Sequence, residues 1–279
     1  MQSNFVRLAA AGARKLGMEC HVQLEERVAS TDAAYRVSGN VLLDKIFGAT
    51  LHSYPEGEDE AGADLRLQEI AAGLRTAGKK PYVIPLAAGH PPLGALGYVV
   101  AAAELLIQIQ EDAIHVDEIF VGSGSGATHA GLLFGLRALG SPIAVTGVCV
   151  RRDAALQKPR ILSICDQIAT LLQTGNKVTD DDVQLIDSFL APGYGVPNQA
   201  TLHAIVTGAQ TEALLLDPVY TGKTMAGLIH RAKHLQDPDS TLLFWHTGGI
   251  PTIFAYQDAF EKALRNSGAN PDTTQESAR

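Results

Sequence analysis

The chain has 279 residues, of which 46% are hydrophobic and 19% charged, and its formal net charge is −8. Such a composition is typical of a globular protein with one large or two modest domains. Because no basic stripe or block of like charges occurs, we expect neither nucleic acid nor an anionic membrane surface as a partner. No apolar run is expected to span a membrane, and no signal peptide is expected. The three cysteines are widely spaced, which predicts no disulfide framework and a reducing compartment, with the cytoplasm as the expectation.

The first third of the chain is predicted to alternate between helices and strands. The expected elements are a helix over 5–15, a strand over 19–25, a polar loop over 26–40, a short helix over 41–47, a strand over 49–54, an acidic loop over 56–64, a helix over 65–77 and a buried strand over 81–86. Alternation of this kind implies a parallel sheet. Pro and Gly dominate residues 87–94, the candidate hinge. We therefore predict a smaller α/β domain over 1–92.

The remainder repeats the alternation and predicts a larger α/β domain over 93–265. Its expected elements are helices over 95–110, 128–139, 159–172, 199–210, 224–234 and 252–264, and strands over 117–122, 142–150 and 241–245. The residues from 266 to 279 are polar and without periodicity, which predicts a disordered tail.

A glycine-rich loop joins a predicted strand to a predicted helix, with glycines at 122, 124 and 126. Glycines let the backbone turn tightly and expose its N–H groups, and the following helix N-terminus adds partial positive charge. The loop is therefore a candidate phosphate site, although ordinary strand–helix turns share this pattern. It also resembles a dinucleotide fingerprint, and Arg151-Arg152-Asp153 could hold a ribose 2′-phosphate, so an NADP-binding oxidoreductase is an alternative.

Four polar or glycine-rich loops are expected to converge at the carboxyl ends of the parallel strands, over 122–128, 191–198, 217–223 and 246–249. Other kinds of site are disfavoured. The first loop lacks the Gly-Lys-Ser/Thr of a Walker loop, and Ser125 lacks the flanking glycines of a nucleophile elbow. The loops carry no paired carboxylates for glycosidase chemistry. His230 and His234 are expected on the surface, and His129 is expected to cap or pack its helix.

Several motifs in order resemble one family of pyridoxal-phosphate enzymes. They are Gln2-Ser3-Asn4, 93–98, 123–131, 193–198, 217–223 and 246–249. The chain resembles the branch of the tryptophan-synthase-β fold type that holds D-cysteine desulfhydrase and aminocyclopropane-carboxylate deaminase, from Gln2 to about Tyr256. The resemblance implies an α/β fold with two open parallel-sheet domains (fold type II), a pyridoxal 5′-phosphate site between them, a small amino-acid substrate and a homodimer.

The resemblance also implies roles for particular residues. The implied cofactor-binding residues are Asn4, Gly124, Ser125, Gly126, Ala127, Thr128, Thr221 and Thr247. Among them, Asn4 would contact the ring hydroxyl, residues 124–128 would cradle the phosphate, and Thr247 would lie near the pyridine ring. Ser3 would hold the substrate carboxylate, with backbone N–H groups of the following helix. Tyr194 and Tyr220 would face the substrate as proton-transfer or positioning groups.

Two positions favour the desulfhydrase within this branch. The deaminase has glutamate where Thr221 stands and leucine where Thr247 stands. A hydroxyl at the pyridine nitrogen makes a weaker electron sink than a carboxylate, which suffices to eliminate a good leaving group. The expected reaction is conversion of D-cysteine, or a related β-substituted alanine, to pyruvate, ammonia and sulfide. Phe5 and Gly89-His90-Pro91 depart from the family pattern, so cysteate sulfo-lyase and aminocyclopropane-carboxylate deaminase activities are alternatives.

The Schiff-base lysine of the family is missing from its expected place. It stands in a Gly-Asn-Lys-like motif before Gln-Ser-Asn, whereas only Met1 precedes Gln2 here. An amine is needed to bind the cofactor and move the α-proton, so the 279-residue chain is expected to be inactive alone. We expect an N-terminally truncated enzyme; a non-catalytic protein that binds pyridoxal phosphate is the alternative. Lys223 matches a family lysine beside the site.

Overall fold

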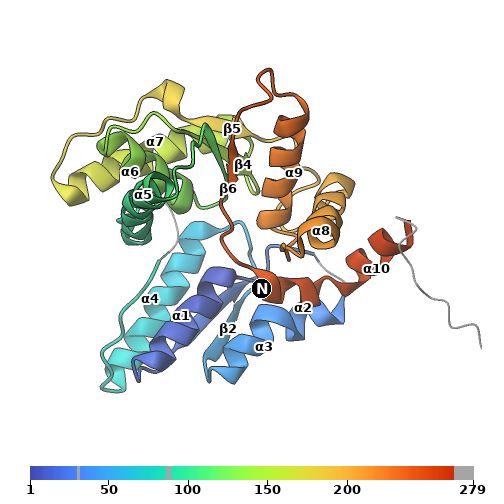
Figure 1. Ribbon diagram of the computed structural model, residues 1–279. Helices are drawn as coiled ribbons and strands as arrows, with labels where there is room; N and C mark the ends of the chain where they lie inside the picture. Colours follow the sequence, from blue (N-terminus) through green and yellow to red (C-terminus); the bar gives the residue numbers. More distant parts are fainter. Residues whose placement is uncertain (30–31, 86–88, 267–279) are drawn as a thin grey trace, which may run out of the picture.

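The computed structural model describes residues 1–29, 32–85 and 89–266, and its helices and strands form two lobes (Figure 1). In chain order the elements are α1 Asn4–Lys15, β1 His21–Glu25, α2 Ala33–Val37, α3 Gly39–Ile46, β2 Thr50–Tyr54, α4 Glu60–Thr76, α5 Leu93–Glu111, β3 Glu118–Ser123, α6 Ala127–Ala138, β4 Ala144–Cys149, α7 Ala154–Leu172, η1 Asp180–Asp182, β5 Gln184–Ile186, α8 Gln199–Glu212, α9 Thr221–Lys233, β6 Leu242–Phe244, η2 Ile250–Ala255 and α10 Gln257–Asn266.

The strands β1 to β6 of the described structure pair in parallel, as the alternation of strands and helices predicts. The larger sheet has the order β5-β4-β3-β6, and the smaller sheet pairs β1 with β2. Helices α5, α6 and α7 lie on one side of the larger sheet, and α8 and α9 lie on the other (Figure 1). Strands β3 and β4 are buried almost throughout because both faces are covered.

The small lobe holds α1, α3, α4 and the two-stranded sheet, and the chain returns to it near its C-terminus (Figure 1). Ala255 and Tyr256 pack with Tyr35 in one hydrophobic cluster, so η2 lies against the N-terminal elements. The domain limits at 92 and 265 remain predictions, and this return adds residues from the end of the chain to the small lobe. Most of the tail expected from 266 onward lies outside the described residues, as do 87–88 of the hinge.

Some predicted elements differ from the observed ones. The strand predicted over 81–86 is wrong for 81–85, where the backbone is irregular and Tyr82 is 76% exposed; residue 86 lies outside the described range. Helix α4 begins earlier than predicted because Asp59 caps it, accepting from Gly62 N at 2.9 Å. Likewise Asp153 caps α7 through Leu156 N at 2.9 Å, so this helix starts before its proline. Helix α2 and strand β5 are additional short elements.

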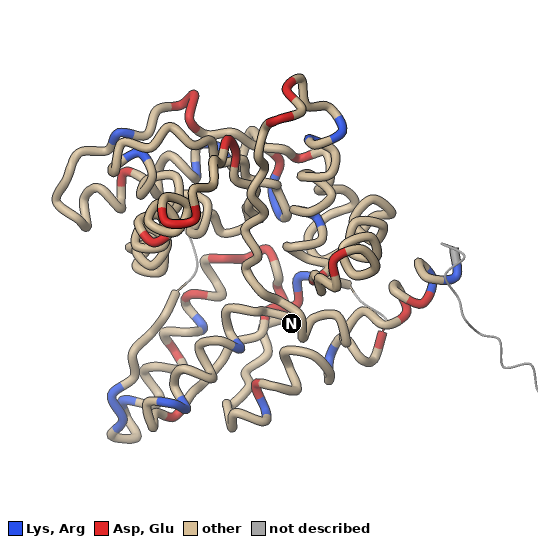
Figure 2. The backbone as a smooth tube through the Cα atoms, viewed as in Figure 1, with Lys and Arg blue, Asp and Glu red and all other residues tan. Residues whose placement is uncertain are grey.

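Helix α5 is long and apolar enough to cross a membrane by length and composition alone, contrary to the expectation that no such run occurs. In the structure its inner face packs on α6. A Cβ at Gly135 of α6 would lie 2.7 Å from Ala102 Cβ, and one at Gly131 would lie 2.4 Å from Ala95 O. The two helices therefore approach closely because small residues line both sides of their contact. Charged residues of both signs are scattered over both lobes (Figure 2).

Candidate active site

Three distant segments meet around Asn4 at the start of α1. The Asn4 Oδ1 atom accepts from Asn40 Nδ2 at 2.7 Å and from Thr252 Oγ1 at 3.0 Å. Its Nδ2 has no acceptor within the described part of the chain. A Cβ at Gly249 would lie 2.8 Å from this Nδ2 and 2.6 Å from Asp217 Oδ2. The loop after β6 therefore passes between Asn4 and Asp217, and the fixed amide of Asn4 keeps a donor free there.

Ser3 and Gln2 complete the N-terminal motif. Ser3 caps α1 by accepting from Val6 N at 3.2 Å, which leaves its hydroxyl proton without an acceptor in the described structure. The buried side chain of Gln2 binds backbone groups of Tyr35, Ser38 and Asn40. The motif is thus anchored by Gln2, while Ser3 and the unpaired N–H groups of the first helical turn present an anion-binding end.

The glycine-rich loop fits a phosphate group. Gly126 adopts φ +97°, and a Cβ there would lie 2.9 and 3.0 Å from two isoleucine side chains of α7. No described residue accepts from the N–H groups of Ser125, Gly126 or Thr128, and Ala127 N reaches only Ser125 Oγ at 3.5 Å. Helix α6 has no side-chain cap. Unpaired donors at a helix start are what a phosphate monoester requires, so the loop fits the phosphate of pyridoxal phosphate.

Asp217 organises the start of α9 behind the glycine-rich loop. Its Oδ1 accepts from Val219 N and Tyr220 N, both at 2.8 Å. Its Oδ2 accepts from Thr221 Oγ1 at 2.7 Å and Thr221 N at 3.0 Å. Burial raises the pKa of Asp217, although these four donors favour its charged form. The hydroxyl proton of Thr221 is therefore committed to Asp217, and its predicted role at the pyridine ring stays a prediction.

Tyr194 and Tyr220 face one another, with their hydroxyl oxygens 2.7 Å apart. Burial raises the pKa of both phenols, so both keep their protons at neutral pH. Lys223 is fully buried and donates to Leu190 O at 2.7 Å and Gly193 O at 2.9 Å, which holds the loop carrying Tyr194. Burial lowers the pKa of Lys223 to about 8. The structure therefore brings the two predicted tyrosines together.

Thr247 lies in a loop whose shape is fixed by its neighbours. His246 Nε2 donates to Leu215 O at 3.1 Å, and its Nδ1 accepts from Gly248 N at 3.0 Å. This pair of contacts fixes the orientation of the His246 ring. Thr247 itself is exposed, and its hydroxyl has no partner among the residues described. It is available to a ligand, as its predicted place beside the pyridine ring requires.

No described lysine stands where the family resemblance expects the Schiff-base lysine. A Gly-Asn-Lys triplet does occur at 175–177, after α7, but Lys177 is exposed and donates to Ala138 O at 3.2 Å. Lys223 is committed to two carbonyl groups, as described above. Neither lysine lies at the position before Gln2 that the family resemblance requires.

Other predicted candidates serve the fold. His129 is completely buried, and burial lowers its pKa to about 4, so it packs as a neutral ring in α6. His90, in the segment that departs from the family pattern, contacts Asp64 Oδ2 of α4 at 2.5 Å. Arg151 and Arg152 bind carboxylates of the small lobe, so the candidate 2′-phosphate site is already engaged in ion pairs.

Asn40 and Thr252 are parts of the site that sequence patterns do not reveal. Asn40 follows Ser-Gly in a segment predicted as the end of a loop, and Thr252 stands 212 residues further along the chain. Their side chains bond to each other at 3.0 Å and both bond to Asn4. The Ser-Gly-Asn sequence could have marked Asn40 as a residue in a constrained turn, but nothing in the sequence joins it to Thr252.

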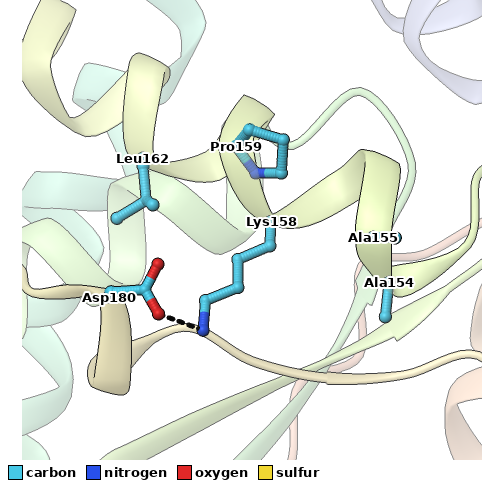
Figure 3. Close-up of a pocket in the computed structure, with 6 residues that line it drawn as sticks. All are labelled: Ala154, Ala155, Lys158, Pro159, Leu162 and Asp180. Atoms are coloured by element: carbon cyan, nitrogen blue, oxygen red, sulfur yellow. Dashed lines mark ion pairs between the residues drawn. The ribbon is translucent and has the colours of Figure 1, made fainter.

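A separate cavity lies away from these loops. It measures about 360 Å³ and opens on the outer side of α7, where Lys158 Nζ contacts Asp180 Oδ2 at 2.5 Å (Figure 3). Its remaining lining residues are Ala154, Ala155, Pro159 and Leu162. It contains none of the predicted site residues, and its one ion pair is satisfied, so it is distinct from the candidate active site.

Comparison with known proteins defines the class. The family described as pyridoxal-phosphate dependent enzyme matches residues 1–248, and the chain belongs to this family. It is 43% identical over 258 residues to D-cysteine desulfhydrase of Salmonella choleraesuis (strain SC-B67), covering 92% of this chain and 76% of that protein. The same protein of Salmonella typhi is 42% identical with the same coverage. A crystal structure described as the ACC deaminase homologue matches with a TM-score of 0.82 at 33% identity, covering 94% and 76% of the two chains. These findings confirm the predicted family, fold class and cofactor.

Proposed function

We propose that the protein is a pyridoxal-phosphate-dependent carbon–sulfur lyase that converts D-cysteine and water to pyruvate, ammonia and hydrogen sulfide. The observation that carries this proposal is the set of unpaired donors in the candidate site: Asn4 Nδ2 and the N–H groups of Ser125, Gly126 and Thr128. Both the ring hydroxyl and the phosphate of the cofactor are acceptors, so this arrangement supports cofactor binding there. The 43% identity to a D-cysteine desulfhydrase supports the choice of substrate.

The roles of the N-terminal residues follow from their free donors. Asn4 would donate from Nδ2 to the ring hydroxyl, with its amide held in place by Asn40 and Thr252. Ser3 would donate its hydroxyl proton to the substrate carboxylate, which the start of α1 also attracts. Pyridoxal phosphate, when bound, withdraws electrons from the substrate α-carbon. The two residues would therefore orient cofactor and substrate relative to each other.

The tyrosine pair supplies protons rather than accepting them. Because burial raises the pKa of Tyr194 and Tyr220, each oxygen carries its proton at neutral pH. One hydroxyl donates to the other across 2.7 Å, and the remaining proton is free to point to a leaving group. We propose that this proton stabilises the departing sulfur. The base that removes the α-proton must be a different group, which in this family is the Schiff-base lysine.

Product analysis tests the reaction. Purified protein with pyridoxal phosphate is assayed on D-cysteine, L-cysteine, cysteate and aminocyclopropane-carboxylate, both as the 279-residue chain and with any residues encoded before Met1. We expect pyruvate and sulfide from D-cysteine once a Schiff-base lysine is supplied, and little turnover by the 279 residues alone. Sulfite from cysteate would favour the sulfo-lyase alternative, and 2-oxobutyrate would favour the deaminase. If the protein binds the cofactor tightly but forms no product even with the lysine present, the non-catalytic alternative is favoured.

We also propose that the protein is a cytoplasmic homodimer. The described cysteines Cys20, Cys149 and Cys165 are all free thiols, which suits a reducing compartment. The outer face of α5 carries exposed apolar side chains, among them Val100 and Ile107. Apolar surface of this kind supports association with a second copy.

A further inference from the structure

Side chains from the β4–α7 region hold the peptide groups of the glycine-rich loop. The Gly124 carbonyl oxygen accepts from Gln157 Nε2 at 3.2 Å and from Arg152 Nη1 at 3.4 Å. The Ser125 carbonyl oxygen accepts from Arg160 Nε at 2.7 Å. Two successive peptide groups are therefore fixed by three side chains that lie outside the loop and outside every motif of the family resemblance.

This arrangement determines where the loop's donors point. In a trans peptide the C=O and N–H groups point in opposite directions. Each carbonyl held on the α7 side therefore turns the N–H of the next residue away from α7, which orients the free donors of Ser125 and Gly126. We propose that Arg152, Gln157 and Arg160 are positioning residues that align these two N–H groups with the cofactor phosphate. The inference rests on the proposed placement of the phosphate at residues 124–128.

The burial, hydrogen bonds and charge of the three residues suit them to this contact. Gln157 is completely buried, and the same Nε2 also donates to Ser123 Oγ at 2.9 Å, at the end of β3. Arg160 forms no ion pair with any carboxylate in the described structure, so its bond to the loop is its one polar contact there. Burial, together with the charges of Arg151 and Arg160, lowers the pKa of Arg152. Arg152 also pairs with Glu60, so the guanidinium of Arg160 is the one of the two that adds an unpaired positive charge behind a loop expected to receive a dianion.

Paired ligands with and without the phosphate test the proposal. Pyridoxine 5′-phosphate and pyridoxine are titrated against the full chain, since neither has an aldehyde that would react with surface lysines. The single tryptophan, Trp245, directly follows β6 and reports binding by fluorescence. We expect Arg160→Met and Arg152→Met each to weaken pyridoxine 5′-phosphate binding roughly ten- to a hundredfold, the range for hydrogen bonds to charged groups, and to change pyridoxine binding less than about threefold.

A charge-matched control separates alignment from overall charge. Lys158→Met removes one positive charge from the same helix, but Lys158 pairs with Asp180 at the outer cavity and touches no loop residue (Figure 3). It should leave both affinities unchanged. Arg160→Lys, which keeps the charge and a donor, should recover part of the affinity for the phosphate ester. An equal loss of both ligands in Arg160→Met, or a loss in Lys158→Met as large as in Arg160→Met, would overturn the proposal.

The wild-type chain distinguishes the two levels of failure. If it binds pyridoxine 5′-phosphate no better than pyridoxine, the placement of the phosphate at residues 124–128 is wrong, and the inference fails with it. If it prefers the phosphate ester but the arginine variants keep the full preference, the positioning role alone is wrong. Neither result depends on turnover of D-cysteine, so the proposed reaction is judged separately by its products.

Discussion

Asp44 is a buried carboxyl group without a hydrogen-bond partner. It lies on α3 with no exposed surface, and neither of its carboxyl oxygens contacts a donor in the part of the chain that the structure describes. Burial raises its pKa to about 6, and only the more distant charges of Arg7 and the N-terminus oppose this. The folded state therefore binds a proton more tightly than the unfolded state, in which the pKa is near its ordinary value.

Replacing Asp44 should remove a pH dependence of stability. Between about pH 4 and 6 the folded chain holds more protons than the unfolded chain, so the free energy of unfolding falls as pH rises, by up to about 3 kcal/mol. We expect Asp44→Asn to abolish this fall and to be more stable than the wild type at pH 7. Urea unfolding at pH 5 and pH 7 measures it, with exposed Asp112→Asn as the control. If the pH dependence of stability is unchanged in Asp44→Asn, a group other than Asp44 causes it.

At the scale of elements, the contact between α5 and α6 depends on the absence of side chains. A Cβ at Gly135 would lie 2.7 Å from Ala102 Cβ and 2.9 Å from Val99 O, both tighter than normal contact. On the opposite side of α5, a Cβ at Gly97 would meet nothing within 4 Å. A side chain at Gly135 would therefore clash with α5, whereas the helix has room for a side chain at Gly97.

Alanine at these two glycines should have effects of opposite sign. Alanine favours a helix over glycine by about 1 kcal/mol, so Gly97→Ala should raise the unfolding temperature. In Gly135→Ala the same gain is outweighed by overpacking, which costs about 1–3 kcal/mol, so the unfolding temperature should fall. Thermal unfolding followed by circular dichroism compares the two variants. A rise in both would mean that α5 can move away from α6 without cost.

Sequence patterns predict most helices and strands, and they fail where tertiary contacts determine the local structure. The alternation predicts the parallel sheet, and the Gly-rich motif predicts the loop that joins β3 to α6 in the structure. The apolar residues over 81–85 suggest a strand, yet Tyr82 and Ile84 remain exposed beside no partner strand. β5 has only three residues, 184–186, and too short a pattern to detect. Side-chain hydrogen bonds also escape a local pattern, because Arg160 lies 35 residues from the carbonyl that it binds.

At the scale of the whole molecule, the outer face of α5 is the proposed contact between two copies. Val100 is 60% exposed and Ile107 is 56% exposed, two turns apart on one side of the helix. We expect Val100→Glu combined with Ile107→Glu to convert the dimer to a monomer, because charges at the centre of an apolar interface are left unpaired. Sedimentation velocity measures the change. Leu65→Glu, on the exposed side of α4, is the control and should remain a dimer.

The ion pairs between the lobes connect cofactor retention to lobe position. Glu60 Oε1 of α4 accepts from both Arg151 and Arg152 at 2.7 Å, and Arg152 also reaches the Gly124 carbonyl of the phosphate loop. Coupling between two equilibria is reciprocal, so if lobe approach strengthens phosphate binding by some factor, phosphate strengthens lobe approach by the same factor. A change confined to Glu60 would then alter the affinity for the cofactor without altering any group that is expected to touch it.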